Sequence, residues 1–209
     1  MLTLLQEEIE LMAELEFQSA ANRYFEFLIT EYGYKCTEST TQSVRFESED
    51  VSITLSFDRQ RSYELNLYIT HLSSSGSDVP AFTIFEILRL RANPEANEFA
   101  LIQLSDKSGI SKWVYRLAEK LRSTALDLIC GDATSFSELF KQRKLDQTKH
   151  QLDRELRIAR IDAEVAWQKK EYRVFVKLLE PYRSALSTSE IKKIDYASKH
   201  LRNASIDNE

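Results

Sequence analysis

The chain has 209 residues, of which 43% are hydrophobic and 29% charged, and its net charge is −5. This is the composition of an ordinary globular protein with enough residues for a substantial core, and two cysteines are too few for a disulfide scaffold. No apolar run approaches the length of a membrane span, and the N-terminus lacks the basic region of a signal peptide. A cytoplasmic protein without a membrane-binding element is therefore expected.

The first predicted element is a helix over residues 3–32, because apolar side chains recur along it at helical spacing. Two apolar stripes, one that ends at Met12 and one that begins at Phe17, are slightly out of phase, which predicts a bend near residues 14–16. Gly33 is the expected C-cap of this helix. The polar residues that follow are expected to form a connector with a short strand near its start.

Residues 44–69 are predicted to form three strands of an antiparallel meander. Apolar and polar side chains alternate along 51–57 and 63–69, and a period of two places each set on one face of a strand. Helices must cover the apolar face, since an isolated hairpin is not stable in water. The other face, either a solvated or a recognition surface, carries small and hydrogen-bonding side chains: Ser52, Thr54, Ser56, Glu64, Asn66 and Tyr68.

Shorter elements are predicted in the middle of the chain. An apolar helix begins near Pro80 and stops at Asn93-Pro94, because proline disfavours the helical conformation of the residue before it. Residues 99–104 fit either a helical turn or an edge strand, and a fourth strand is the preferred interpretation. A helix over 110–129 follows, closed by Gly131.

A long helix is predicted over residues 136–169. Ser135 and Glu138 have capping-box spacing, which is a signal for a helix start. Its middle, residues 141–160, is rich in charge and poor in apolar side chains. Such a helix is expected to be mostly exposed to solvent.

The C-terminus is predicted to be a pair of helices. One covers residues 172–182 and is disturbed at Pro181, and the other covers 189–202 after a second capping-box match at Ser187 and Glu190. With the end of the long helix, this pair looks like one tetratricopeptide-type helical unit, although no 34-residue repeat follows it.

These elements predict an α+β fold. A small antiparallel sheet of three or four strands is packed with helices, and a long helix and a C-terminal helical hairpin follow it. Residues 1–132 are expected to form the α+β domain and residues 133–209 the helical region, with the two packed together as one unit.

The charges are distributed unevenly along the chain. Residues 1–70 contain 5 Lys and Arg residues against 13 Asp and Glu, whereas residues 141–202 contain 16 against 9. An acidic docking surface, a basic arm for nucleic acid, or simple packing of the two ends against each other would explain this asymmetry. The acidic residues interleaved along the long helix favour a solvated face over a nucleic-acid stripe.

The sequence carries no signature of catalysis or of cofactor binding. His71, His150 and His200 are isolated from other residues of metal-ligand type, and there is no Gly-rich phosphate loop. Asp58 and Glu64 could pair as carboxylates of a metal nuclease, but the lysine of a Glu-x-Lys site is missing. We therefore expect a protein that is not an enzyme, with no cofactor and no metal site.

Two groups of motifs carry a family resemblance. The first lies in the meander: Val44-Arg45-Phe46-Glu47-Ser48, Asp58-Arg59 and Ser62-Tyr63-Glu64-Leu65. The second lies in the C-terminal helices: Ala166-Trp167, Leu179-Glu180-Pro181-Tyr182 and Tyr196-Ala197-Ser198-Lys199-His200-Leu201. Over residues 20–203 the chain resembles a largely uncharacterised family of bacterial cytosolic proteins, some of which look like toxin-immunity proteins. It departs from the family pattern at Gln60-Arg61, an extra pair in the hairpin loop.

The resemblance implies a protein that binds and neutralises a bacterial toxin without catalysis. The acidic first third suits a basic, nuclease-like toxin domain, because complementary charge speeds association. The residues expected to contact the partner belong to the meander: Asp50, Asp58, Arg59, Arg61, Glu64, Asn66 and Tyr68. Two alternatives stay open. One is a nucleic-acid-associated protein that uses the basic C-terminal helices, although nucleic acid is the less expected partner. The other is a helical scaffold or adaptor protein.

Overall fold

The computed structural model describes residues 16–72, 80–104 and 109–206, with the backbone alone at 204–206. The chain divides into two compact units, Met1–Arg143 (unit 1) and Lys144–Glu209 (unit 2). The boundary lies inside the long helix and not at residues 132/133. The reason is that the first turns of this helix place Phe136 and Leu139 in the core of unit 1.

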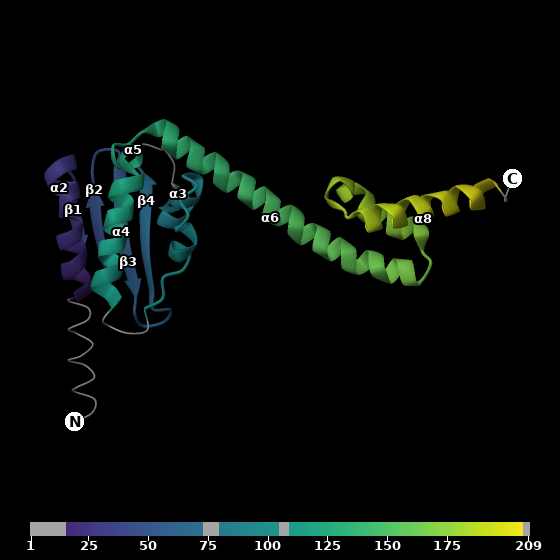
Figure 1. Cartoon of the computed structure of the whole chain (residues 1–209), viewed down its shortest axis with the longest axis horizontal. Helices are drawn as coiled ribbons and strands as arrows, with labels where there is room; N and C mark the ends of the chain where they lie inside the picture. Colours follow the sequence, from purple (N-terminus) through teal and green to yellow (C-terminus); the bar gives the residue numbers. More distant parts are fainter. Residues whose placement is uncertain (1–15, 73–79, 105–108, 207–209) are drawn as a thin grey trace, which may run out of the picture. The chain divides into compact units, whose positions relative to one another are not determined.

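Unit 1 is built on a five-stranded antiparallel sheet whose strands follow one another in chain order (Figure 1). The strands are β1 Lys35–Ser39, β2 Ser43–Glu47, β3 Val51–Asp58, β4 Glu64–His71 and β5 Phe82–Thr83. The predicted α+β class is confirmed, with five strands where the sequence predicts three or four. β5 occupies the start of the segment predicted to be a helix after Pro80.

The register of the strands brings the alternating apolar side chains together on one face. Phe46 lies opposite Ile53, and Ile53 lies opposite Ile69, which in turn faces Phe82 across β4 and β5. All four side chains are buried. Because the side-chain period of a strand is two, this register also aligns the polar side chains on the opposite face.

Helices cover the apolar face of the sheet and complete the core of unit 1. Figure 1 shows α2 and α4 lying across that face. Besides a helical stretch over residues 16–24, the helices of the unit include α2 Glu26–Tyr32, α3 Ile84–Leu90, a 3-10 turn at Ala96–Phe99, α4 Ile110–Thr124 and α5 Leu126–Ile129. The burial of large side chains such as Val114, Leu117 and Leu121 of α4 holds these layers together.

The predicted helix over residues 3–32 is interrupted at Phe25. The chain is helical over residues 16–24 and again along α2, while residues 14 and 15 of the predicted bend lie outside the described part. The Phe25 ring is fully buried and lies 6.1 Å from the rings of both Phe27 and Phe46. The break therefore lets neighbouring aromatic side chains reach one core. Gly33 ends α2 in the left-handed conformation at φ 72°, as predicted.

The prediction of a strand over residues 99–104 is wrong. Phe99 ends the 3-10 turn, and the chain then meets the start of β4 at an isolated bridge between Gln103 and Glu64. Tyr63 accepts a hydrogen bond at its carbonyl from the Leu104 amide at 2.9 Å. Its φ is 55° and its side chain is exposed, so Tyr63 does not continue the apolar face of β4 as its spacing suggests.

Unit 2 is helical. It contains most of α6 Ala133–Gln168, followed by α7 Tyr172–Leu179, a 3-10 segment Glu180–Ala185 and α8 Thr188–Ile206. Its core contains Ala159, Ala163 and Ala166 of α6 with Leu156, Phe175, Leu179 and Ile194. Residues 144–155 are exposed at nearly every position, as expected from their charge. Along the described residues, no helix combines the length and apolar character needed to cross a lipid bilayer.

Of the two capping boxes that the sequence predicts, one is present. The Ser187 amide donates to Glu190 at 2.7 Å and the Glu190 amide donates to Ser187 at 3.3 Å, so α8 begins as predicted. The other prediction, Ser135 with Glu138, is wrong because α6 begins earlier. The Asp132 carboxylate accepts hydrogen bonds from both the amide and the hydroxyl of Ser135, at 2.9 and 2.8 Å.

Candidate functional site

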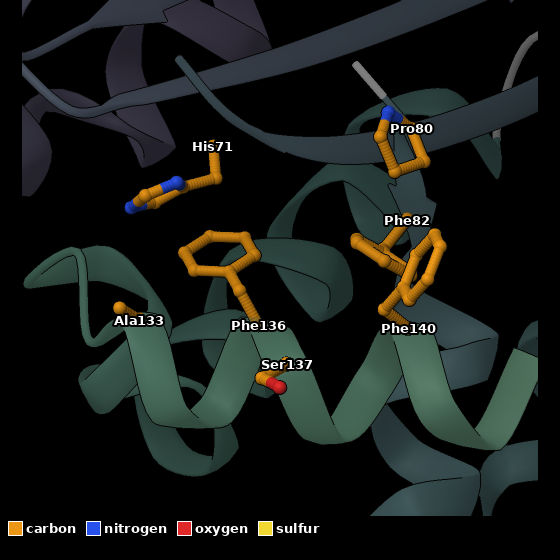
Figure 2. Close-up of a pocket in the computed structure, with 7 residues that line it drawn as sticks. All are labelled: His71, Pro80, Phe82, Ala133, Phe136, Ser137 and Phe140. Atoms are coloured by element: carbon orange, nitrogen blue, oxygen red, sulfur yellow. The ribbon is translucent and has the colours of Figure 1, made fainter. Parts of the chain in front are cut away.

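An apolar hollow of about 420 Å³ opens on unit 1 between the sheet and the start of α6 (Figure 2). We call it the Phe140 hollow. Its described lining is His71, Pro80, Phe82, Ala133, Phe136, Ser137 and Phe140. The volume lies within the range of sites that bind small molecules or receive the anchoring side chains of a partner.

Three elements supply the rings around the Phe140 hollow. His71 ends β4, Phe82 lies on β5, and Phe136 and Phe140 lie one helical turn apart on α6. The His71 and Phe136 rings are 4.7 Å apart, and the Phe136 and Phe82 rings are 6.4 Å apart. Figure 2 shows His71 and Phe136 facing each other, with Phe140 beside Phe82. Phe136 is buried, whereas the Phe140 side chain is 47% exposed.

Arg143 holds α6 against the wall of the hollow. Its guanidinium lies 4.1 Å from the centre of the Phe82 ring and donates to the Ala81 carbonyl at 2.6 Å. It also pairs with Glu86 of α3, at 2.6 Å. Burial opposes ionisation of Glu86, but hydrogen bonds from Arg143 and Thr83 outweigh it and hold the pKa of Glu86 below its usual range.

Carboxylates lie beside the hollow at the end of the sheet. Asp50 accepts a hydrogen bond at its carbonyl from the Leu72 amide at 2.6 Å, and it approaches Gly131 closely. A Cβ on Gly131 would come within 3.3 Å of the Asp50 Cβ, and Gly131 has a φ of 78°, so this position favours glycine. Asp132, the next residue, is also exposed, and hydrogen bonds from Ser135 hold its pKa below its usual range. The sheet end of the hollow is therefore acidic.

The residues predicted to contact a partner do not form one surface. Asp50 precedes β3 and Asp58 ends it, so the two lie at opposite ends of an eight-residue strand. At about 3.3 Å per residue this separation is on the order of 25 Å. Asp50 thus lies beside the Phe140 hollow, whereas Asp58, Arg59, Arg61 and Glu64 lie at the far end of the sheet.

Asn66 and Tyr68 lie between these ends, on the polar face of the sheet. Asn66 faces Ser56 across β3 and β4, and Tyr68 faces Thr54 on one side and Thr83 on the other. Ser52 is buried, and the other side chains of this face on β3 and β4 are half-buried. It is therefore a continuous polar surface, as the alternation predicts, and it contains Arg45, whose guanidinium lies 3.6 Å from Glu38.

Asp58 has a role within its own loop. Its carboxylate accepts hydrogen bonds from the amides of Gln60 and Arg61, at 3.2 and 3.1 Å, and from the Ser62 hydroxyl at 3.1 Å. Desolvation opposes ionisation, but these hydrogen bonds together outweigh it and hold the pKa of Asp58 below its usual range. The residue shapes the hairpin turn, which is a structural role that the sequence interpretation did not assign to it.

His71, Phe136 and Phe140 were not among the predicted site residues. The spacing of Phe136 and Phe140, four residues apart at the start of a polar helix, was the available signal. No local sequence pattern connects these two residues with His71, which lies 65 residues before Phe136 in the chain. Within the ranges that the structure describes, no three His, Cys, Asp or Glu side chains gather in a way that could hold a metal ion.

Comparison with protein-family models, with curated proteins and with solved structures finds no match to this chain. The shape and charge of its surfaces are therefore the basis for a functional proposal.

Proposed function

We propose that this chain is a non-catalytic protein-binding module of the immunity type, which neutralises a basic toxin domain by direct binding in the cytoplasm. One observation carries the proposal: the Phe140 hollow, an apolar cavity with an exposed ring, lies beside the exposed carboxylates of Asp50 and Asp132. The sequence resemblance to bacterial proteins that look like toxin-immunity proteins supports the same function.

The hollow suits the insertion of one large apolar side chain of a partner. Protein interfaces concentrate their binding energy in a few such anchors, which fill dry, well-packed pockets. The only polar side chains in its described lining are those of His71 and Ser137. A metabolite site is also mostly apolar but uses a few polar groups to fix the orientation of its ligand, and with only these two the lining fits an apolar anchor of a protein.

The carboxylates of Asp50 and Asp132 complement a partner whose anchoring side chain is surrounded by basic residues. Asp50 and Asp132 are exposed at the sheet end of the hollow, and Asp50 belongs to the acidic first third of the chain. Charges at the edge of an interface act mainly on the rate of association. A toxin that acts on nucleic acid presents a basic active site, and an acidic cover would occupy it.

A display library of random peptides tests the binding chemistry even while the partner is unidentified. Peptides enriched on the full chain are expected to contain one large apolar residue next to Lys or Arg. Phe140→Asp should abolish their binding. Leu145→Asp is the matched control, since Leu145 is 65% exposed on the same helix and does not line the hollow. Enriched peptides that are acidic, or that bind Phe140→Asp as well as the wild-type chain, would contradict the proposal.

Growth rescue tests the immunity function itself. The chain is co-expressed with the toxin domain encoded beside its gene, or with a panel of nuclease-type toxin domains if no such neighbour exists. Wild-type chain and Leu145→Asp should restore growth, and Phe140→Asp should not. If no member of the panel is neutralised, the immunity function fails even where peptide binding succeeds, so the two parts of the proposal are separable.

A further inference from the structure

Unit 2 carries a second hollow that the function proposed for unit 1 does not use. It is shallow, has a volume of about 420 Å³ and is lined by Trp167, Ser189, Lys192, Lys193 and Tyr196. We call this surface the Trp167 face. Trp167 comes from the end of α6 and the other four residues from α8, so the α6–α8 packing positions the whole surface.

The floor of the Trp167 face is a cluster of aromatic rings in contact with one another. The Trp167 ring lies 5.6 Å from the Tyr172 ring and 6.0 Å from the Tyr196 ring, and Tyr172 and Tyr196 are also 6.0 Å apart. These are edge-to-face contacts, a favourable arrangement of aromatic pairs. Although its ring has these neighbours, Tyr196 is still 54% exposed. The rings therefore form a preorganised apolar floor that solvent reaches.

Lysines surround this floor. The Lys193 ammonium lies 5.1 Å from the centre of the Trp167 ring and 3.5 Å from a carboxylate oxygen of Glu164. This arrangement holds the Lys193 ammonium beside the rings. Lys192 lines the hollow, and Lys199 lies two turns further along α8. Both are exposed, and neither pairs with a carboxylate of the described residues.

We propose that the Trp167 face is a second binding surface, which takes an acidic peptide segment of a protein partner that carries one apolar or aromatic side chain. The apolar side chain covers Trp167 and Tyr196, and the carboxylates that flank it meet Lys192, Lys193 and Lys199. The charge of this surface is opposite to that of the Phe140 hollow. The two units then bind partners of opposite charge, and the chain works as an adaptor as well as a neutralising module.

A peptide suits this surface better than a strand of nucleic acid. Strand binding requires a basic groove that follows several successive phosphates. Here carboxylates interrupt the lysines. Glu164 pairs with Lys193, and Asp195, 60% exposed beside Tyr196, pairs with Arg183 at 2.7 Å. The hollow holds one or two side chains, so it suits a peptide with a single apolar residue better than a continuous phosphate backbone.

Fluorescence anisotropy on the full chain tests the proposal. The probes are labelled synthetic peptides rich in Glu and Asp that contain a single Phe or Leu, with peptides rich in Lys as the reversed-charge set. Lys192→Glu should weaken binding of the acidic peptides by about tenfold at low salt, and less at high salt. Tyr196→Ala should weaken it by a similar factor at both salt concentrations, because its contribution is apolar. Lys149→Glu makes the same charge change at an exposed position on α6, about 27 Å from Trp167 along the helix. It should change the affinity for the acidic peptides by less than about twofold.

Circular dichroism of each variant shows whether unit 2 is still folded, and the exposed Lys192→Glu carries the test if Tyr196→Ala unfolds it. The proposal is overturned if the acidic peptides do not bind, or if Lys192→Glu and Lys149→Glu weaken binding equally. It is also overturned if a single-stranded oligonucleotide binds more tightly than the peptides at physiological salt, since the surface would then be a nucleic-acid site. None of these outcomes depends on the Phe140 hollow.

Discussion

Arg143, the last residue of unit 1, donates hydrogen bonds from Nε and Nη2 to the Glu86 carboxylate at 2.6 and 2.7 Å. Glu86 also accepts hydrogen bonds from the amide and the hydroxyl of Thr83, in the capping box that starts α3. One carboxylate therefore joins α6 to α3 and stabilises the start of α3. The wall of the Phe140 hollow depends on this pair, because the Arg143 guanidinium lies over Phe82.

Arg143→Met should destabilise unit 1 by about 2 kcal/mol at neutral pH, as expected for loss of hydrogen bonds to a charged and partly buried group. Arg154→Met, at an exposed position on the same helix, should change the free energy of unfolding by less than about 0.5 kcal/mol. Urea unfolding followed by circular dichroism measures both. Equal effects of the two substitutions would show that the pair with Glu86 adds nothing to stability.

The ion pair of Glu190 with Arg160 should make the stability of unit 2 dependent on pH. The Arg160 guanidinium and Ser187 lower the pKa of Glu190 from 4.5 to about 2. Because the folded-state pKa is depressed, the stabilisation is complete above pH 4.5 and is lost as the pH falls toward 2.

Glu190→Gln tests this pH dependence. The substitution should lower the thermal midpoint of unit 2 at pH 7 and have much less effect near pH 2, where most of the stabilisation from the wild-type carboxylate is already lost. Thermal unfolding at both pH values measures the difference. A decrease of the same size at pH 7 and near pH 2 would assign the effect to packing and not to the charge of Glu190.

Leu55 and Leu65 are both buried on the apolar face of the sheet, as their alternation predicts. Replacing either by Ala should destabilise unit 1 by about 2–5 kcal/mol, the range found for large deletions in protein cores. Ser56→Ala, on the opposite face of β3, should have a much smaller effect. If neither leucine variant changes the denaturation midpoint, the result is incompatible with this sheet.

Asp50→Lys and Asp58→Lys should separate a partner contact from a structural role. Asp58→Lys removes the acceptor of three hydrogen bonds in the hairpin loop, so it should lower the thermal midpoint. Asp50→Lys reverses an exposed charge beside the Phe140 hollow, so it should leave the midpoint nearly unchanged and slow the association of basic peptides. Stopped-flow binding at two salt concentrations measures the second effect. If Asp58→Lys alone slows association, the partner surface lies at the hairpin.

Local patterns in the sequence were sufficient to predict much of the fold. The alternation along β3 and β4 predicts which face is buried, because side chains of a strand point to opposite faces at every step. Gly33 and the Ser187–Glu190 capping box mark helix ends in the structure as predicted, since both signals act within a few residues of the backbone. These features depend on short-range geometry, which sequence spacing describes directly.

Where two signals competed, spacing in the sequence did not predict which one the folded chain would use. Asp132 displaced Ser135 as the residue that caps α6, because its carboxylate satisfies both the amide and the hydroxyl of Ser135. Residues 99–104 are apolar enough for a strand, but the chain meets β4 there at a single bridge. The break at Phe25 follows from the packing of its ring against Phe46, from β2.

The candidate sites also required the tertiary structure. The sequence interpretation combined Asp50 and Asp58 in one surface, and the extended geometry of β3 separates them by the length of the strand. The Phe140 hollow joins His71 to Phe136 across 65 residues, and the Trp167 face joins the end of α6 to α8. By itself the sequence determined most of the secondary structure and the buried face of the sheet, because these follow from local periodicity. Only the folded chain determined which distant side chains meet, because packing and strand register set those distances.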